Sequence, residues 1–230
     1  MNKKSWIIFS VVTVAILTGL VMYSKKDNLD VSKIDVTKVQ TANSQNGNIA
    51  DHIFGKTDSK VTLIEYGDFQ CPPCASVYPR LKAISEQYSN QLQFVFRNFP
   101  ITSIHANAKA MAAAAESAGI QGKYWEMHNK IYENQSAWSE LSETDRTPYI
   151  AGLDKALSLN VDKLKSDMAS NNVSKKIDYD IALGKKAGVQ GTPTIFLNGK
   201  LLDADSYGSD SKLKDAINAE LKKAGIALPN

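Results

Sequence analysis

The sequence has few of the residues on which several common functions depend. Only Cys71 and Cys74 are cysteines among 230 residues, so the chain cannot build the multiple disulfide framework that staples small secreted folds. A structural zinc site needs four ligands, and neither a second cysteine pair nor suitably spaced histidines are present. The net charge is only +3 and no long basic run occurs, which argues against nucleic-acid binding.

An uncharged, mostly apolar stretch lies close to the first residue, from Trp6 to Tyr23, with lysines at both ends. Roughly 18 apolar residues just reach the length needed to cross a bilayer. The stretch ends in GLVMYSKK, which lacks the small-residue pattern of a signal-peptide cleavage site. We therefore predict that residues 1–25 form an uncleaved single-pass membrane anchor, with the rest of the chain outside the cytoplasm. A cleaved signal peptide, giving a secreted protein, is the alternative.

A polar segment follows at residues 26–47, and we predict that it is a spacer between membrane and domain. Next comes VTLIEYG, residues 61–67, which is rich in β-branched and apolar residues and predicts a buried central strand. Residues 74–88 have the apolar spacing of a helix, and LQFVFRNF predicts a second strand. This strand, helix, strand order favours a parallel pair joined by a crossover.

The pattern then changes to an almost continuous series of helices over residues 105–187. Strand signals resume in TPTIFLNGKLL, where Asn198 and Gly199 predict a hairpin turn. The segment SDSKLKDAINAELKKAG closes the chain as an amphipathic helix that ends near Gly225. We predict an α/β domain made of residues 48–104 and 188–230, interrupted by a helical insertion at 105–187.

The cysteine pair lies between the first strand and the first helix, as C-P-P-C. If Cys71 is the N-cap, Pro72 and Pro73 occupy the first two helical positions, where a missing N–H breaks no intrahelical bond. A Cys71 thiolate would then face the positive end of the helix, which lowers its pKa and makes it a nucleophile. Cys74 would be the resolving thiol. A structural disulfide, a zinc site and two ordinary buried cysteines are the alternatives.

Two further features favour a redox pair. Glu65 is a carboxylate inside the apolar strand, and burial there should raise its pKa and let it exchange protons with Cys74. Alternatively, Glu65 pairs with a lysine or points to solvent. Pro193 follows Thr192 at the start of a predicted strand, a position that suits either a cis bond or a plain strand-start proline.

These motifs resemble the DsbA-like branch of the thioredoxin superfamily. EYGDFQCPPC, FRNFP, QGKYWEMHNKIYE and GVQGTPTIFLNG are similar to segments of that family and occur in its order, over residues 47–225. The resemblance implies a thioredoxin fold with an inserted helical domain, behind the N-terminal anchor. It also implies a thiol–disulfide oxidoreductase that acts outside the cytoplasm and needs no cofactor or metal beyond its redox-active disulfide.

The resemblance also implies a role for each candidate site residue. Cys71 would be the exposed attacking sulfur, Cys74 the buried one and Glu65 the buried acid. Pro193 would be a cis-proline facing the disulfide, and beside it the Thr192 backbone would let a substrate peptide lie alongside as an added strand. The implied partners are exported proteins with thiols, a quinone-linked membrane oxidase that restores the disulfide, and the membrane itself.

One departure concerns the redox strength of the pair. The best-known periplasmic members have a histidine just before the second cysteine, where this chain has Pro73. The positive charge is lost and the two prolines remove two N–H donors, so we predict a less stabilised Cys71 thiolate and a weaker oxidant. A Cys71 pKa well below about 4.5 would contradict this.

The sequence therefore predicts an enzyme that donates its Cys71–Cys74 disulfide to exported proteins. A reductase or isomerase that uses the same cysteines is an alternative, and a peptide-binding chaperone is one from another class. Three nearby residues receive no catalytic role. Asp68 is predicted to be a solvated loop carboxylate, His105 a capping or packing residue, and His128 a packed core histidine.

Overall fold

The computed structural model describes residue 6 and residues 9–18 and 29–229. The chain divides into two compact units, 1–33 and 34–230, and each is described by itself. In the first unit residues 9–18 are helical. The predicted anchor and the start of the predicted spacer fall partly outside the described residues, and no described helix has the length and apolarity to cross a membrane.

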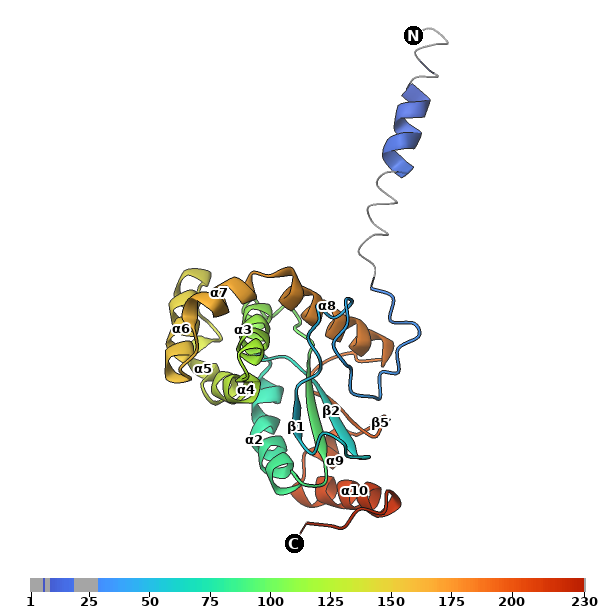
Figure 1. Ribbon diagram of the computed structural model, residues 1–230, viewed down its shortest axis with the longest axis vertical. Helices are drawn as coiled ribbons and strands as arrows, with labels where there is room; N and C mark the ends of the chain where they lie inside the picture. The colour runs from blue at the N-terminus through green and yellow to red at the C-terminus, as the bar shows by residue number, and fades with distance from the viewer. Residues whose placement is uncertain (1–5, 7–8, 19–28, 230) are drawn as a thin grey trace. The chain divides into compact units, whose positions relative to one another are not determined.

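A single mixed sheet forms the centre of the second unit (Figure 1). Within residues 29–229 its five strands lie in the order β1–β3–β2–β4–β5. Their bounds are β1 Ile53–Gly55, β2 Thr62–Gly67, β3 Gln93–Asn98, β4 Thr194–Leu197 and β5 Lys200–Leu201. β2 and β3 are parallel, which confirms the predicted crossover pair. β4, which follows the helical insertion in sequence, pairs with β2 in the antiparallel direction.

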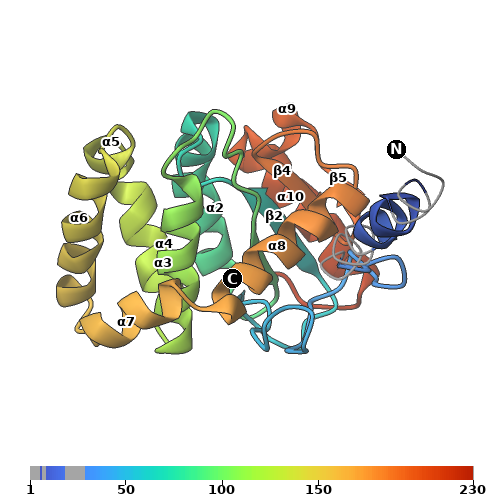
Figure 2. The same ribbon diagram turned by 90° about the horizontal axis from the view of Figure 1, so that it is seen from above.

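The helices surround this sheet as the predicted pattern requires. Their bounds are α2 Pro72–Gln87, α3 Ala108–Ile120, α4 Tyr124–Glu133, α5 Gln135–Trp138, α6 Glu143–Ala156, α7 Val161–Met168, α8 Asn171–Lys186, α9 Ala204–Tyr207 and α10 Asp210–Lys223. α2 and α10 pack together on one face of the sheet, and α8 packs against β3. Helices α3 to α7 gather beside the sheet (Figure 2). The thioredoxin fold with a helical insertion is confirmed.

Helix α8 falls within the predicted insertion at residues 105–187, but it packs directly on the sheet. The backbone N–H of Asn98 in β3 donates to Asp180 Oδ2 of α8 at 3.1 Å. A Cβ on Gly184 of α8 would meet the rings of Phe99 and Tyr66, so α8 lies directly on the strands there. The amphipathic pattern of α8 gives its length but not the layer on which it packs.

Residues 34–47, which fall in the predicted spacer, group with the second compact unit. Asn46 is fully buried, and the backbone N–H of Gln40 donates to the buried Asp51 at 2.9 Å. Gly47 has φ +64° and lies against the backbone of Asn172, where a Cβ would clash. Polar composition made the segment resemble a linker, but its amides form specific buried hydrogen bonds.

Buried charges hold this segment to the sheet and to α8. Asp51 accepts from Arg97 Nη2 at 2.8 Å and from Lys176 Nζ at 2.9 Å, and all three side chains are at most 1% exposed. Lys176 also contacts Asp180 at 2.6 Å, and Arg97 donates to the carbonyl oxygen of Lys38 at 2.6 Å. The network therefore joins the chain before β1 to β3 and α8.

Candidate functional site

The cysteine pair lies where β2 ends and α2 begins. Cys71 is the N-cap of α2, and its backbone N–H donates to the carbonyl oxygen of Asp68 at 3.0 Å. Pro72 and Pro73 take the first two helical positions as predicted, and Cys74 follows on the first turn. Both cysteines are free thiols in this structure. The tight loop and the helix start therefore fix both sulfurs at one end of the sheet.

Cys71 is the more accessible of the two sulfurs, but it is less exposed than the resemblance implies. The residue is 5% exposed and Cys74 is 0% exposed. The Cys71 thiol donates to the carbonyl oxygen of Thr192 at 3.3 Å, so the loop before β4 covers it. The Thr192 carbonyl therefore restricts access to the Cys71 sulfur.

The environment of Cys71 favours its thiolate. A hydrogen bond from the Cys74 side chain is the main cause that lowers the pKa of Cys71 to about 6, against the opposing effect of burial. The Thr192 side chain and the Cys74 backbone N–H lower the pKa further by hydrogen bonding. The bond to the Thr192 carbonyl belongs to the thiol form, since a thiolate cannot donate. A pKa of about 6 lies above about 4.5, the value below which the prediction of a weaker oxidant would fail.

Cys74 has the opposite character. Burial raises its pKa far above the ordinary value, and the hydrogen bond to Cys71 and the charge of Glu65 add to the effect. The two thiols thus differ strongly in acidity although they are neighbours on one helical turn. Cys71 is suited to attack and to leave as a thiolate, whereas Cys74 needs a proton once its bond to Cys71 breaks.

Glu65 is a buried titratable group that interacts electrostatically with both cysteines. It lies on β2 and is only 2% exposed. Its side chain is on the same face of the strand as that of Leu63, which packs against α2 and α10. Burial, and secondarily the charge of Cys71, raises its pKa to about 8. The carboxyl group is therefore protonated at neutral pH, and the predicted upward shift agrees with this environment.

Stability should depend on pH through Glu65. The folded pKa of about 8 exceeds the unfolded value of about 4.3, so folding favours the protonated form. This contribution is complete below the unfolded pKa and is lost as the pH rises through the folded one. We expect unfolding free energy in urea, for the reduced protein, to fall between pH 5 and pH 8 by up to roughly 1.4 kcal/mol per pH unit relative to Glu65→Leu.

Glu143→Leu is the control for this measurement, because the Glu143 side chain is 89% exposed. Its difference from the wild type should be the same at both pH values. Equal pH slopes for the wild type and Glu65→Leu would show that Glu65 is not held protonated by burial.

The loop before β4 completes the site. The peptide bond between Thr192 and Pro193 is cis, which confirms the first of the two readings of this proline. β4 begins at the next residue, where Thr194 pairs with Tyr66 of β2. The Thr192 carbonyl oxygen lies beside Cys71. The structure thus brings together Cys71, Cys74, Glu65, Thr192 and Pro193.

Asp68 is buried, so the prediction of a solvated loop carboxylate is wrong. Its side chain is 0% exposed, and it accepts from the backbone N–H groups of Gln70 at 2.8 Å and Ile101 at 2.7 Å. His105 Nδ1 lies 2.8 Å from Asp68 Oδ2. The carboxylate therefore fixes the loop that leads into Cys71. The β3–α3 loop supplies two of these contacts. Their residues lie 33 or more positions away in the sequence, so no local sequence pattern indicates them.

Two glutamines from separate elements also brace the motif loop. Gln135 Nε2 donates to the carbonyl oxygens of Phe69 at 2.7 Å and Cys71 at 3.1 Å. Gln70 Nε2 donates to the carbonyl oxygen of Ser139 at 2.7 Å. A polar groove runs beside this loop, lined in part by these two glutamines, Pro72 and His105. The helical insertion thus holds the cysteine loop and forms one side of its approach.

Comparison with known families and curated proteins agrees with this geometry. The family described as Thioredoxin matches residues 47–219. The probable disulfide bond formation protein D of Bacillus anthracis is 30% identical over 223 residues, which cover 94% of this chain and 95% of that protein. The Na(+)/H(+) antiporter NhaA 1 of Salinispora arenicola is 35% identical over 150 residues. That match covers 65% of this chain but only 22% of the antiporter, so the chain spans less than a quarter of its length.

Solved structures share the fold. BdbD from Bacillus subtilis, in its oxidised form, superposes with a TM-score of 0.66 at 23% identity, over 80% of this chain and 97% of that one. DsbA2 from Pseudomonas aeruginosa has a TM-score of 0.59 at 24% identity, over 75% and 96%. At these identities the likeness concerns the fold alone.

Proposed function

The chain belongs to the thioredoxin family, among its DsbA-like thiol–disulfide oxidoreductases, and from this premise we propose that it oxidises exported proteins by donating its Cys71–Cys74 disulfide. The observation that carries the proposal is the difference in acidity between the two thiols. A pKa of about 6 at Cys71 stabilises the reduced form, and a pair whose reduced form is stabilised is an oxidant. The relative from Bacillus anthracis, named for disulfide bond formation, supports the same direction.

The reaction has two exchange steps. A substrate thiolate attacks Cys71 Sγ, the Cys71–Cys74 bond breaks, and Cys74 leaves and takes a proton from Glu65. A second substrate thiolate then attacks the substrate sulfur of the mixed disulfide, and Cys71 leaves as a thiolate. Two electrons pass from the substrate to the cysteine pair, and the substrate gains the disulfide.

The Thr192–Pro193 loop is proposed to hold the substrate during these steps. Its carbonyl already contacts Cys71, and an extended peptide that pairs with this backbone would present a sulfur to Cys71. When a substrate docks, its own N–H would replace the Cys71 thiol at the Thr192 carbonyl. A quinone-linked membrane oxidase is the proposed acceptor of the two electrons, as the family resemblance implies.

The proposed location is outside the cytoplasm and in association with the membrane. The apolar stretch from Trp6 to Tyr23 and its flanking lysines support this, because the length suits a membrane span. Labelling of the reduced cysteines in intact cells with a membrane-impermeant thiol reagent tests it. Labelling only after lysis would place the domain in the cytoplasm and overturn the proposed location.

The reduction potential of residues 34–230, the folded unit, tests the direction of the reaction. Because the pKa of Cys71 is lowered only to about 6, we expect a potential between about −270 mV, the thioredoxin value, and about −120 mV, the DsbA value. Equilibration in glutathione buffers measures it. A value near −270 mV would identify a reductase, and a value near −120 mV would contradict the weakening assigned to Pro73.

A further inference from the structure

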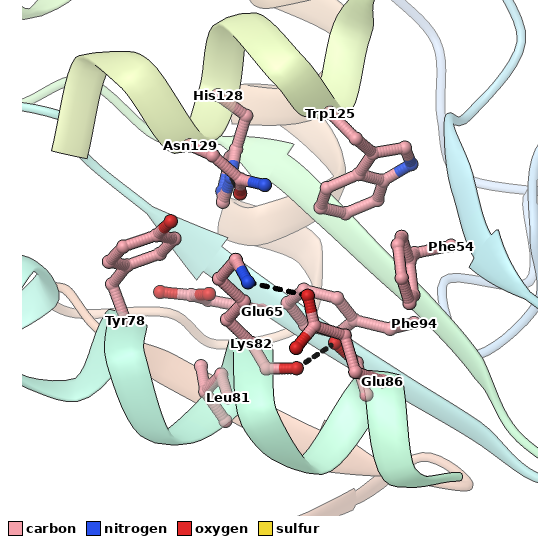
Figure 3. Close-up of a pocket in the computed structure, with 11 residues that line it drawn as sticks. Phe54, Glu65, Tyr78, Leu81, Lys82, Glu86, Phe94, Trp125, His128 and Asn129 are labelled. Carbon is pink, nitrogen blue, oxygen red and sulfur yellow. Dashed lines mark hydrogen bonds and ion pairs between the residues drawn. The ribbon is translucent and has the colours of Figure 1, made fainter. Parts of the chain in front are cut away.

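Two buried polar atoms without partners face one small cavity behind the cysteine pair. Glu65 Oε1 of β2 and His128 Nε2 of α4 are both inaccessible to solvent and have no hydrogen-bond partner among the described residues. Both residues line the same cavity between β2, α2 and α4 (Figure 3). A buried polar group without a partner is costly, so two such atoms on one cavity call for a shared explanation.

The size of the cavity indicates what could satisfy them. The cavity volume is about 10 Å³, which matches the smallest space that holds one water molecule. A buried water needs at least two polar partners, and Glu65 and His128 supply two. Trp125 also lines the cavity and its Nε1 has no partner among the described residues, but Figure 3 shows this nitrogen on the side of the ring away from His128.

The hydrogen bonding of His128 fixes which role its ring nitrogen plays. Nδ1 lies 3.1 Å from Asn129 Oδ1, and because an amide oxygen only accepts, Nδ1 carries the hydrogen. Burial lowers the pKa of His128 to about 4, so the ring is neutral between pH 5 and pH 8. Nε2 is therefore an acceptor, and it requires a donor inside the cavity.

Glu65 has a complementary need. Once its proton passes to Cys74, the carboxylate is buried with no cation in contact with Oε1 among the described residues. The charged and titratable groups around it come from three helices. They are Cys71 at the N-cap of α2 and Cys74, Tyr78, Lys82 and Glu86 within it, Tyr124, His128 and Tyr132 of α4, and Tyr207 of α9. Lys82 and Glu86 form an ion pair at the cavity with side chains 35% and 49% exposed, so that side opens toward solvent.

We propose that Glu65 and His128 together hold one water molecule, and that this water passes protons between Glu65 and solvent beside Lys82 and Glu86. The water donates one hydrogen to His128 Nε2. Its second hydrogen bond is to Glu65: the water accepts from the protonated carboxyl group and donates to the carboxylate. His128 is thus a positioning residue for the buried acid, and it acts through the water. The proposal rests on the proposed function for its role in the reaction, but its tests require no substrate.

The wild-type crystal structure of the oxidised protein is the first test. We expect a water within about 2.6–3.2 Å of both Glu65 Oε1 and His128 Nε2, the ordinary range for such hydrogen bonds. A direct Glu65–His128 hydrogen bond, or a cavity with no water in a well-ordered map, would overturn the proposal. This test does not depend on whether any variant folds.

Carbon-detected NMR titration of Glu65 in oxidised wild type and variants is the second test, because oxidised cysteines do not titrate. Phenylalanine in His128→Phe is a ring of similar size without nitrogens, so the water loses one of its two partners. Without the water the Glu65 carboxylate has no hydrogen-bond donor, and the pKa of Glu65 should rise by about one unit. In His128→Gln, whose amide can hold the water, the value should return toward that of the wild type.

The relative size of the Glu65 pKa change in the two variants distinguishes a positioning role of His128 from a packing role. His128 is surrounded by aromatic rings, including Phe69, Phe96 and Trp125, so Phe should pack there better than Gln. A larger disturbance of the Glu65 pKa in His128→Gln than in His128→Phe would therefore indicate a packing role and overturn the proposal. Tyr78→Phe is the matched control, since Tyr78 lines the cavity but its hydroxyl donates to Glu133; the Glu65 pKa should not move.

Both readouts use the resting protein, so their outcomes are independent of the redox direction. A potential near that of thioredoxin would overturn the proposed function and leave the water site standing. A missing water would overturn the water site and leave disulfide donation standing.

Discussion

Cys71→Ser reduces disulfide transfer to the uncatalysed rate, whereas Cys74→Ser retains the attacking sulfur and accumulates mixed disulfides. Serine cannot form a disulfide, so the first variant lacks the sulfur that exchanges with substrate. The second variant keeps a sulfur of lowered pKa, although loss of the Cys74 hydrogen bond should raise that pKa from about 6. It has no neighbouring thiol to release a bound partner, so the adduct persists.

Oxidation of a reduced dithiol peptide measures the first effect, and non-reducing gels of the variant mixed with peptide disulfide measure the second. The double variant Cys71→Ser/Cys74→Ser should give neither transfer nor adduct. If Cys71→Ser gave adducts as readily as Cys74→Ser, the two cysteines would have exchanged roles. Full peptide binding by Cys71→Ser, with catalysis absent from the wild type as well, would favour a peptide-binding chaperone.

The chemistry of the pair was predictable because its determinants are local in sequence. Four consecutive residues place Cys71 at a helix start with two prolines after it, and one buried central strand places Glu65 six residues earlier. The hairpin turn followed from Asn198 and Gly199, which adopt φ 49° and 79° as the predicted turn requires. Elements whose rules operate over a few residues were therefore identified correctly.

The features that escaped prediction depend on contacts between distant segments. Asp68 is polar and lies in a loop, which favours solvent exposure, but partners from the β3–α3 loop bury it. The segment from residue 34 has the composition of a linker, yet it is fixed by Arg97 and by the backbone around Asn172. His128 was correctly placed in the core, but the cavity it shares with Glu65 arises only when β2 and α4 meet.

Asp51→Asn should destabilise the protein by about 3–5 kcal/mol, the usual effect of removing one partner from a buried ion pair. Asp51 is the carboxylate that Arg97 and Lys176 share, and an amide leaves both cations buried without their common counter-charge. Most domains have only about 5–15 kcal/mol of stability in total, so the loss is a large fraction. Denaturant unfolding measures it. Asp178→Asn on α8, whose pair with Lys109 is half-exposed, is the matched control and should lose less than about 1 kcal/mol.

The pH dependence of the same variant separates charge from packing. Burial alone would raise the pKa of Asp51, but the charges of Lys176 and Arg97 hold it well below the ordinary value. For a depressed pKa, the stabilisation is present above the unfolded pKa of about 3.9 and is lost as the pH falls. Wild-type stability should therefore decline below about pH 4 more steeply than that of Asp51→Asn. A parallel decline in the two proteins would mean that the charge of Asp51 contributes nothing and that the variant is weakened by its altered packing alone.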